Sequence, residues 1–130
     1  MNLIIGSHVS YNNKSQLLGS VKEALSYKAN TFMFYTGAPQ NTNRSVIEDS
    51  LTMEAYKLMK ENNIALEKVI VHAPYIVNLA NFNNFDFSVS FLINEVERCS
   101  TLGIKYLVLH PGSAVNCSRE EAINNISKGL

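Results

Sequence analysis

Several features that identify common functional classes are scarce or absent in this sequence. Its 2 cysteines, Cys99 and Cys117, show neither CxxC nor zinc-finger spacing, so we expect buried or free thiols in a reducing cytosol. Its 11 basic and 11 acidic residues cancel to a net charge of +0, so bulk charge attracts the chain neither to nucleic acid nor to membranes. No apolar run approaches the roughly 20 residues of a membrane span, and the amino terminus lacks a signal-peptide pattern. We therefore expect a cytoplasmic protein that does not bind membranes.

The composition is that of a folded domain, with 46% hydrophobic and 17% charged residues in a chain of 130. Four short apolar runs, at residues 3–9, 31–35, 69–73 and 106–110, alternate with segments of helical periodicity. Such continuous runs predict strands that are buried on both faces of a parallel sheet. The chain is thus expected to repeat a strand–helix unit four times without a linker.

Local signals place the expected helices. The first carries Leu17, Leu18, Val21, Ala24 and Leu25 at helical spacing, and the second starts near Thr52 and ends at Asn62-Asn63. Ser88 is expected to cap the third, with an inner stripe of Leu92, Val96, Cys99 and Leu102 before Gly103. Ser118 and Glu121 form a capping box for the fourth, which runs through Ile126 to the last residue.

The connections are long after each strand and short before it, as in a (β/α)8 barrel whose active site lies at the carboxyl ends of the strands. A complete barrel needs about 250 residues. We therefore predict that residues 1–130 are the amino-terminal half of one barrel domain, truncated within a helix. A doubly wound sheet of four strands is the alternative.

All three histidines of the chain, His8, His72 and His110, follow or end an apolar run. In a parallel α/β protein they would lie at the rim where chemistry is done, and imidazole is both the commonest metal ligand and the usual acid/base near neutral pH. The alternative is that each ring caps its strand by bonding to backbone. That alternative is favoured for His8, which we expect to be structural or to support the ligands.

Proline follows two of these histidines closely, in His72-Ala73-Pro74-Tyr75 and His110-Pro111-Gly112-Ser113. Proline stops the strand and fixes the turn. Gly112 would let backbone approach a ligand closely, and Ser113 adds a hydroxyl. No Asp or Glu lies at an expected strand end, so any further ligands of a metal bound by His72 and His110 must come from residues outside this chain.

Four segments together resemble a known family. Gly6-Ser7-His8-Val9-Ser10, Tyr35-Thr36-Gly37-Ala38-Pro39-Gln40-Asn41, Val71-His72-Ala73-Pro74-Tyr75 and Leu109-His110-Pro111-Gly112-Ser113 occur in this order. They are similar to the amino-terminal half of endonuclease IV, the zinc-dependent apurinic/apyrimidinic endonuclease of base-excision repair.

This resemblance implies hydrolysis of the phosphodiester 5′ to abasic sites in double-stranded DNA by zinc-activated water. The family holds three zinc ions, and His72 and His110 match two of its ligands, with no catalytic residue separate from the ligands in this chain. Gln40 and Asn41 match a loop that enters the minor groove, and Tyr75 matches a residue near the flipped-out sugar. The complete protein is expected to be monomeric.

The chain departs from the family at Gln40, where some members have Arg, and at Ala114, where members often have His. Structural alternatives also exist. Tyr75 could be a hydrophobic lid, Gln40-Asn41 could be ordinary turn residues, and Phe32, Phe34 and Tyr35 are expected in the core. Lys14, Arg44 and Arg119 fall in loops of the same rim, where they either touch phosphate or are solvated.

Two other functions compete with the nuclease. A metal-dependent sugar isomerase or epimerase has a similar barrel, but it would need a Glu or Lys base at a strand end, and none is found. A non-catalytic half-barrel is the third possibility. We expect residues 1–130 alone to be inactive, because two histidines cannot hold a zinc cluster.

Overall fold

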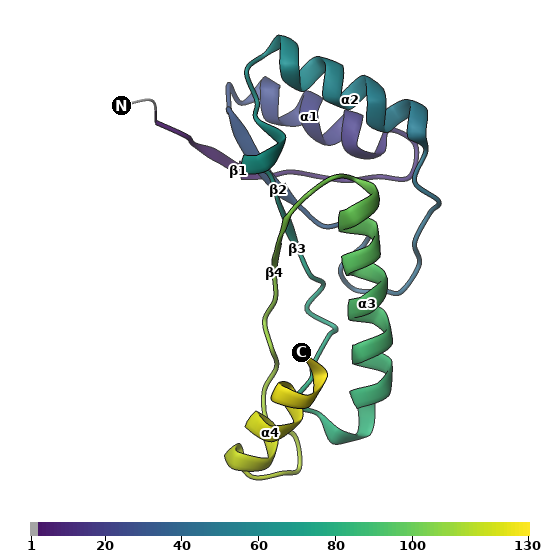
Figure 1. Cartoon of the computed structure of the whole chain (residues 1–130), viewed down its shortest axis with the longest axis vertical. Coiled ribbons are helices and arrows are strands. Elements are labelled where there is room, and N and C mark those ends of the chain that lie inside the picture. The colour runs from purple at the N-terminus through teal and green to yellow at the C-terminus, as the bar shows by residue number, and fades with distance from the viewer. Residues whose placement is uncertain (1–2) are drawn as a thin grey trace.

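The computed structural model describes residues 3–130 and contains one parallel sheet with alternating helices (Figure 1). The strands are β1 (Gly6–His8), β2 (Thr31–Phe34), β3 (Ile70–His72) and β4 (Tyr106–Val108). The helices are α1 (Gln16–Ser26), α2 (Asp49–Glu61), α3 (Phe85–Thr101) and α4 (Arg119–Gly129), with two short 3-10 turns, η1 (Leu66–Lys68) and η2 (Phe82–Asn84). The predicted order of four strand–helix units is confirmed.

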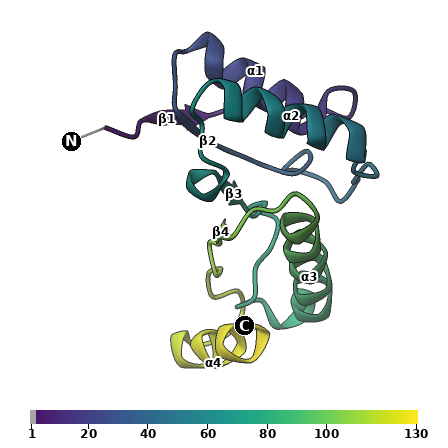
Figure 2. The same ribbon diagram turned by 45° about the horizontal axis from the view of Figure 1, so that its top comes forward.

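The strands lie in the order β1-β2-β3-β4, and every neighbouring pair is parallel. Sequential order without reversal is the arrangement of a (β/α)8 barrel, whereas a doubly wound sheet reverses its order at a switch point. The structure is thus about half of a barrel, and the doubly wound alternative is wrong. In two views α1 and α2 lie side by side at one end and α4 lies at the other (Figures 1 and 2).

One face of the sheet packs against helices. Phe32, Phe34 and Val71 are buried there together with apolar residues of α1 and α2. A second, smaller cluster lies beneath α3, where Leu79 and Leu92 are buried. Because side chains alternate between the faces of a strand, the residues between these buried positions point to the opposite, concave face.

The apolar segment before β1 departs from the expectation of burial on both faces. Leu3, Ile4 and Ile5 are 72%, 50% and 60% exposed, respectively. The described chain places no element against this edge or against the concave face. Strands β1, β3 and β4 are also shorter than the apolar runs that predicted them, at three residues each.

Three helix predictions need correction. Helix α2 begins at Asp49 rather than near Thr52. Helix α3 begins at Phe85, so Ser88 is not its cap but a buried residue inside it, and its hydroxyl bonds to the backbone of Asn78. Val96 is 52% exposed and therefore does not belong to the inner stripe of that helix.

Other local predictions are confirmed. Helix α2 ends at Glu61 with Asn62 as its C-cap, and Gly103, after the C-cap Leu102 of α3, adopts a φ of +68°, as a left-handed helix stop requires. Ser118 and Glu121 form both bonds of the capping box. Within residues 3–130 no helix is long and apolar enough to cross a membrane.

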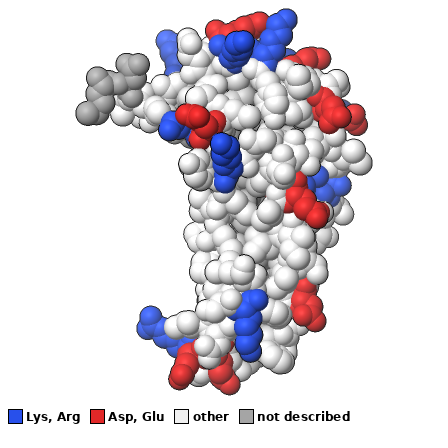
Figure 3. Space-filling model, viewed as in Figure 1, with Lys and Arg blue, Asp and Glu red and all other residues white. Residues whose placement is uncertain are grey.

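Charged side chains are distributed unevenly over the face seen in Figure 3. They gather over α1 and α2 at one end and over α4 at the other, a few lie along the α3 edge, and the rest of the surface between the two ends is uncharged. Basic and acidic groups are interspersed at both ends, so this face has no continuous basic stripe. The neutral net charge of the chain agrees with this distribution.

Candidate functional site

Four aromatic rings, one from each strand or the residues directly after it, lie in a row at the carboxyl ends of the strands. The ring centroids of His8 and Tyr35 are 4.7 Å apart, those of Tyr35 and His72 are 5.2 Å apart, and those of His72 and His110 are 5.0 Å apart. The predicted convergence of His72 and His110 on one rim is therefore confirmed. Tyr35 was expected in the core, and this is wrong. Its side chain is only partly buried, and its ring lies between those of His8 and His72.

The register of the sheet explains this row. His8 pairs with Met33 and Met33 pairs with Ile70, so His8 is level with residues that lie two positions before Tyr35 and His72. His72 pairs with Val108, which lies two positions before His110. Because each two-residue step returns to the same face, all four rings share the concave face, and the row climbs from β1 to β4.

The imidazole of His72 is oriented by its own backbone neighbour. Its Nδ1 lies 2.6 Å from the carbonyl oxygen of Ala73. A carbonyl oxygen can only accept, so in the neutral imidazole this contact places the proton on Nδ1 and leaves the lone pair on Nε2. An Nδ1–H bond to backbone carbonyl is the arrangement that commonly fixes metal-binding histidines. His72 is thus prepared to act as a ligand through Nε2.

The two histidines do not complete a metal site by themselves. Among residues 3–130, no group of three or more His, Cys, Asp or Glu side chains lies close enough to hold a metal ion. A catalytic zinc site typically takes three protein ligands. Two imidazoles, His72 and His110, can therefore supply only part of the ligand set of such a site.

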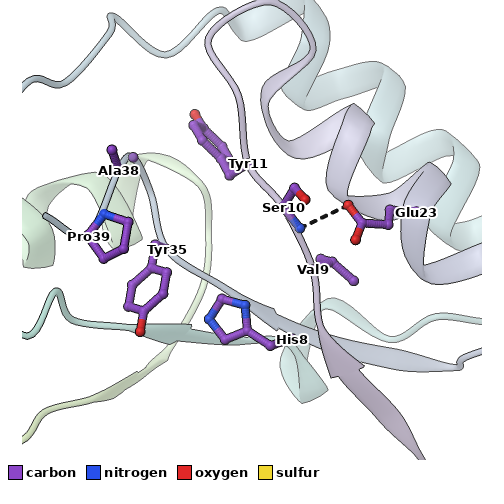
Figure 4. A pocket seen from close by; sticks show the side chains of 9 residues that line it. His8, Val9, Ser10, Tyr11, Glu23, Tyr35, Ala38 and Pro39 are labelled. Carbon is purple, nitrogen blue, oxygen red and sulfur yellow. Dashed lines mark hydrogen bonds between the residues drawn. The ribbon is translucent and has the colours of Figure 1, made fainter.

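A cavity of about 370 Å³ opens beside His8 and Tyr35 at the same rim (Figure 4). Its wall includes Glu23, whose Oε2 accepts from the backbone N–H of Ser10 at 2.9 Å. That bond lowers the pKa of the Glu23 carboxyl. Desolvation, and then the proximity of His72, lower the pKa of His8. The site therefore favours the neutral form of the His8 imidazole, next to Tyr35.

The loops that follow β3 and β4 are joined by one amide side chain. Asn78 Nδ2 donates to the Ser113 carbonyl at 3.1 Å, and Asn78 Oδ1 accepts from Ser113 N–H at 3.2 Å. The Ser113 backbone rather than its hydroxyl makes these contacts. Gly112 was expected to let the backbone approach a ligand closely. In the structure the group close to Gly112 is the Asn78 side chain, since a Cβ at Gly112 would lie 2.0 Å from Asn78 Oδ1.

The residues expected to contact DNA lie at the surface of two loops. Tyr75 is 60% exposed although the preceding Pro74 is fully buried. Gln40 and Asn41 lie in the loop after β2, where Asn41 is exposed. Asn41 Oδ1 also accepts from Asn43 N–H at 3.0 Å, so this side chain shapes the loop as the turn interpretation predicts.

Arg44 corrects another expectation. Its side chain neither reaches toward phosphate nor is solvated, because it is buried and pairs with Glu95 of α3 at 2.6 Å. No role in the site was expected for Tyr35, Asn78 or Glu95. Only Glu95 had a local signal, since an acidic residue on the buried face of an amphipathic helix requires a partner.

Comparison with known proteins agrees with this architecture. A family model described as Xylose isomerase-like TIM barrel matches residues 21–130. The chain belongs to this family.

Individual relatives are more specific. A protein of Acholeplasma laidlawii (strain PG-8A) named "Probable endonuclease 4" is 55% identical over 130 residues, covering 98% of this chain and 44% of that protein. A protein of Bacillus velezensis with the same name is 52% identical over 132 residues, covering 98% of this chain and 43% of that protein. The crystal structure of endonuclease IV from Thermus thermophilus matches with a TM-score of 0.76 and 26% identity, covering 97% of this chain and 46% of that one.

The resemblance to endonuclease IV is thus confirmed in sequence and in fold. The chain spans less than half the length of these relatives.

Proposed function

We propose that the chain contributes the amino-terminal half of the active site of a DNA repair endonuclease that hydrolyses the phosphodiester 5′ to abasic sites. The observation that carries the proposal is the pair His72 and His110, whose ring centroids lie 5.0 Å apart at the strand ends, between exposed loops. Its support is the similarity of the whole chain to proteins named endonuclease 4 and to a solved endonuclease IV.

The donor set is suited to zinc. In the neutral His72 ring the Nδ1 contact with Ala73 leaves the lone pair on Nε2, and the adjacent His110 is exposed at the rim. Neutral imidazole is a preferred ligand of Zn²⁺, so these two residues would hold part of a zinc site. When bound, zinc lowers the pKa of water and stabilises negative charge on phosphate oxygens. We propose three ions in the complete protein, in line with the family resemblance.

The chemistry of the proposed reaction is hydrolytic. A water molecule loses a proton as its oxygen bonds to phosphorus, the bond from phosphorus to the 3′ oxygen breaks, and the leaving oxygen takes a proton. In this chain Tyr35 packs between His8 and His72, and so keeps the His72 ring from rotating away from the rim. Asn78 holds the loop after His110 against the loop after His72. Both contacts favour a preorganised site.

Selection of the substrate is assigned to the loops at the surface. Gln40 and Asn41 belong to the loop after β2, and Tyr75 projects from the loop after β3. An abasic nucleotide lacks base stacking, so turning it out of the duplex costs little free energy. Gln40 carries no charge, and it would therefore act in the minor groove by shape and hydrogen bonding. We propose that the complete protein acts as a monomer in the cytoplasm.

The test is made on the polypeptide that the whole reading frame encodes. We expect it to incise a duplex with one abasic site and to leave the matched intact duplex uncut. His72→Ala and His110→Ala should each lower both bound zinc and incision, whereas His8→Ala, the matched control, should retain the zinc. Full zinc content and full activity in both ligand variants would contradict the proposal, as would a lack of abasic-site incision by the zinc-loaded parent.

A further inference from the structure

A buried cluster of charged and polar side chains lies beneath the proposed DNA loop, residues 36–45. We call Thr36, Arg44, Glu95 and Arg98 the anchor cluster. The first two belong to the loop and the last two belong to α3, one turn apart on the same helix face. Thr36 and Glu95 are fully buried, and Arg98 is nearly so. Burying these charged groups costs free energy unless they are paired, so we expect each of them to have a bonded partner.

Glu95 is bonded at both of its carboxylate oxygens. Oε1 accepts from Arg44 Nε at 2.6 Å, and Oε2 accepts from the Thr36 hydroxyl at 2.7 Å. The two loop residues lie near opposite ends of the loop. A single carboxylate on α3 therefore holds both ends of the loop.

Arg98 repeats this connection with the opposite charge. Its Nη2 donates to the carbonyl of Thr36 at 2.9 Å, and its Nη1 donates to the carbonyl of Ser45 at 2.7 Å. Its Nε donates to the Thr36 hydroxyl at 3.0 Å. The ends of the loop are thus closed onto the same helix a second time.

Arg44 extends the anchor toward the tip of the loop. Its Nη1 lies within hydrogen-bond distance of three loop carbonyls, Ala38 at 3.3 Å, Asn41 at 3.2 Å and Asn43 at 2.9 Å. Its guanidinium also lies 4.8 Å from the centroid of the Phe91 ring, which stacks on Phe87. Such a planar group, bonded at several edges and stacked on a ring, cannot be replaced by Lys without loss of contacts.

We propose that the anchor cluster positions Gln40 and Asn41, so that Arg44, Glu95 and Arg98 are positioning residues for recognition of DNA by the loop. This inference rests on the proposed function. Residues 36–45 form no helix or strand, and an unanchored loop would lose conformational entropy when it binds. Because α3 directly follows the loop of His72 and Tyr75, the same helix also sets the distance between the minor-groove loop and the candidate metal site.

The experiment compares Arg44→Lys and Glu95→Gln with a control, Glu67→Gln, which removes a carboxylate from the exposed Glu67–Lys68 pair. The encoded full-length polypeptide is used throughout. Hydrogen–deuterium exchange of a peptide covering residues 36–45 measures the order of the loop without DNA. Zinc content, and kcat and KM on an abasic duplex, are measured on the same samples.

We expect faster exchange of the loop and a KM about tenfold higher in Arg44→Lys, the lower end of the cost of losing a residue that orients a metal ligand. Zinc content and kcat should change little, and the control should match the parent. Adding Gln40→Ala to Arg44→Lys should raise KM by less than the product of the two single effects, since both act on the same contact. Glu95→Gln tests the same inference if Arg44→Lys folds poorly.

Several outcomes would overturn the inference. One is unchanged loop exchange in both anchor variants. Another is faster loop exchange but an unchanged KM in the anchor variants, if Gln40→Ala by itself raises the KM. If neither Gln40→Ala nor the anchor variants alter KM on a duplex that the parent incises, the loop does not bind DNA, and this inference fails while the proposed function stands. A zinc-loaded parent that incises no abasic duplex contradicts the proposed function instead, and loop exchange then decides the anchoring alone.

Discussion

Asn78 and Ser113 form a two-point bridge in which a side-chain amide pairs with a backbone peptide 35 residues away, at 3.1 and 3.2 Å. Asn78 Oδ1 additionally accepts from Ala80 N–H at 3.1 Å. The bridge connects the loop after His72 to the loop after His110. Asn78 therefore links the positions of the loops that follow the two candidate ligands.

Replacement of Asn78 by Ala should destabilise the protein and loosen the site. Three hydrogen bonds are lost, and because each contributes about 1 kcal/mol, we expect the free energy of unfolding to fall by about 2–3 kcal/mol. Chemical denaturation measures this change. Asn83→Ala, an exposed amide in η2, is the matched control and should leave the stability nearly unchanged. Equal stability of the two variants would show that the bridge does not hold the loops.

Gly112→Ala should be more harmful than a change of one methyl group suggests. The backbone φ of +126° is disfavoured for any L side chain, and the new Cβ would lie 2.0 Å from Asn78 Oδ1. We expect a lower melting temperature and weaker zinc binding. The double variant Asn78→Gly with Gly112→Ala removes the collision but keeps the strained φ, so partial recovery is expected. A melting temperature of the single variant equal to that of the parent would contradict the geometry.

Gln40→Ala and Tyr75→Ala should weaken binding of the full-length protein to abasic DNA more than they disturb folding. Both side chains lie in surface loops outside the buried clusters. Fluorescence anisotropy with a labelled abasic duplex measures the affinity, and thermal melting checks the fold. Thr42→Ala, an exposed change in the loop of Gln40, is the control. Parent-like binding and incision by both variants would mean that the loop assignments are wrong.

The two thiols should differ in reactivity. Burial, reinforced by the nearby Glu95 carboxylate, raises the pKa of Cys99 to about 11, and Cys99 is buried in the main core. Cys117 is partly exposed in the loop before α4. Because the thiolate is the reactive species, a thiol reagent at about pH 8 should modify Cys117 in the native protein and Cys99 only after unfolding. Mass spectrometry of digested samples identifies the modified residue, and rapid native labelling of Cys99 would disagree with its burial.

A polypeptide of residues 1–130 alone should have no incision activity and should self-associate. Its described part offers two histidine ligands, and Leu3, Ile5, Tyr106 and Val108 are exposed along the two open edges of the sheet. Unpaired edges and apolar patches favour association. Sedimentation and an incision assay with excess zinc test both statements. Robust incision at the abasic site would mean that the ligand count is wrong or that a dimer completes the site.

Local sequence signals predicted a large part of this structure. The alternation of apolar runs with helical periodicity determines the four strand–helix units, because each unit is formed by contacts between neighbours in the chain. The stop at Gly103 and the capping box at Ser118 are encoded in the same local way. The position of His72 and His110 after parallel strands was sufficient to predict that their rings meet.

Pairings between distant residues were decided only by tertiary structure. Arg44 and Glu95 are 51 residues apart, so no spacing rule joins them, and Arg44 looked like a solvated or phosphate-binding loop residue. The stagger between strands placed Tyr35 rather than a second imidazole next to His8, and hydrogen-bond register cannot be read from one strand at a time. The sequence by itself thus determined that the three histidines reach the rim. The packing of α3 and the strand register decided which side chains touch, because those contacts depend on the relative placement of whole elements.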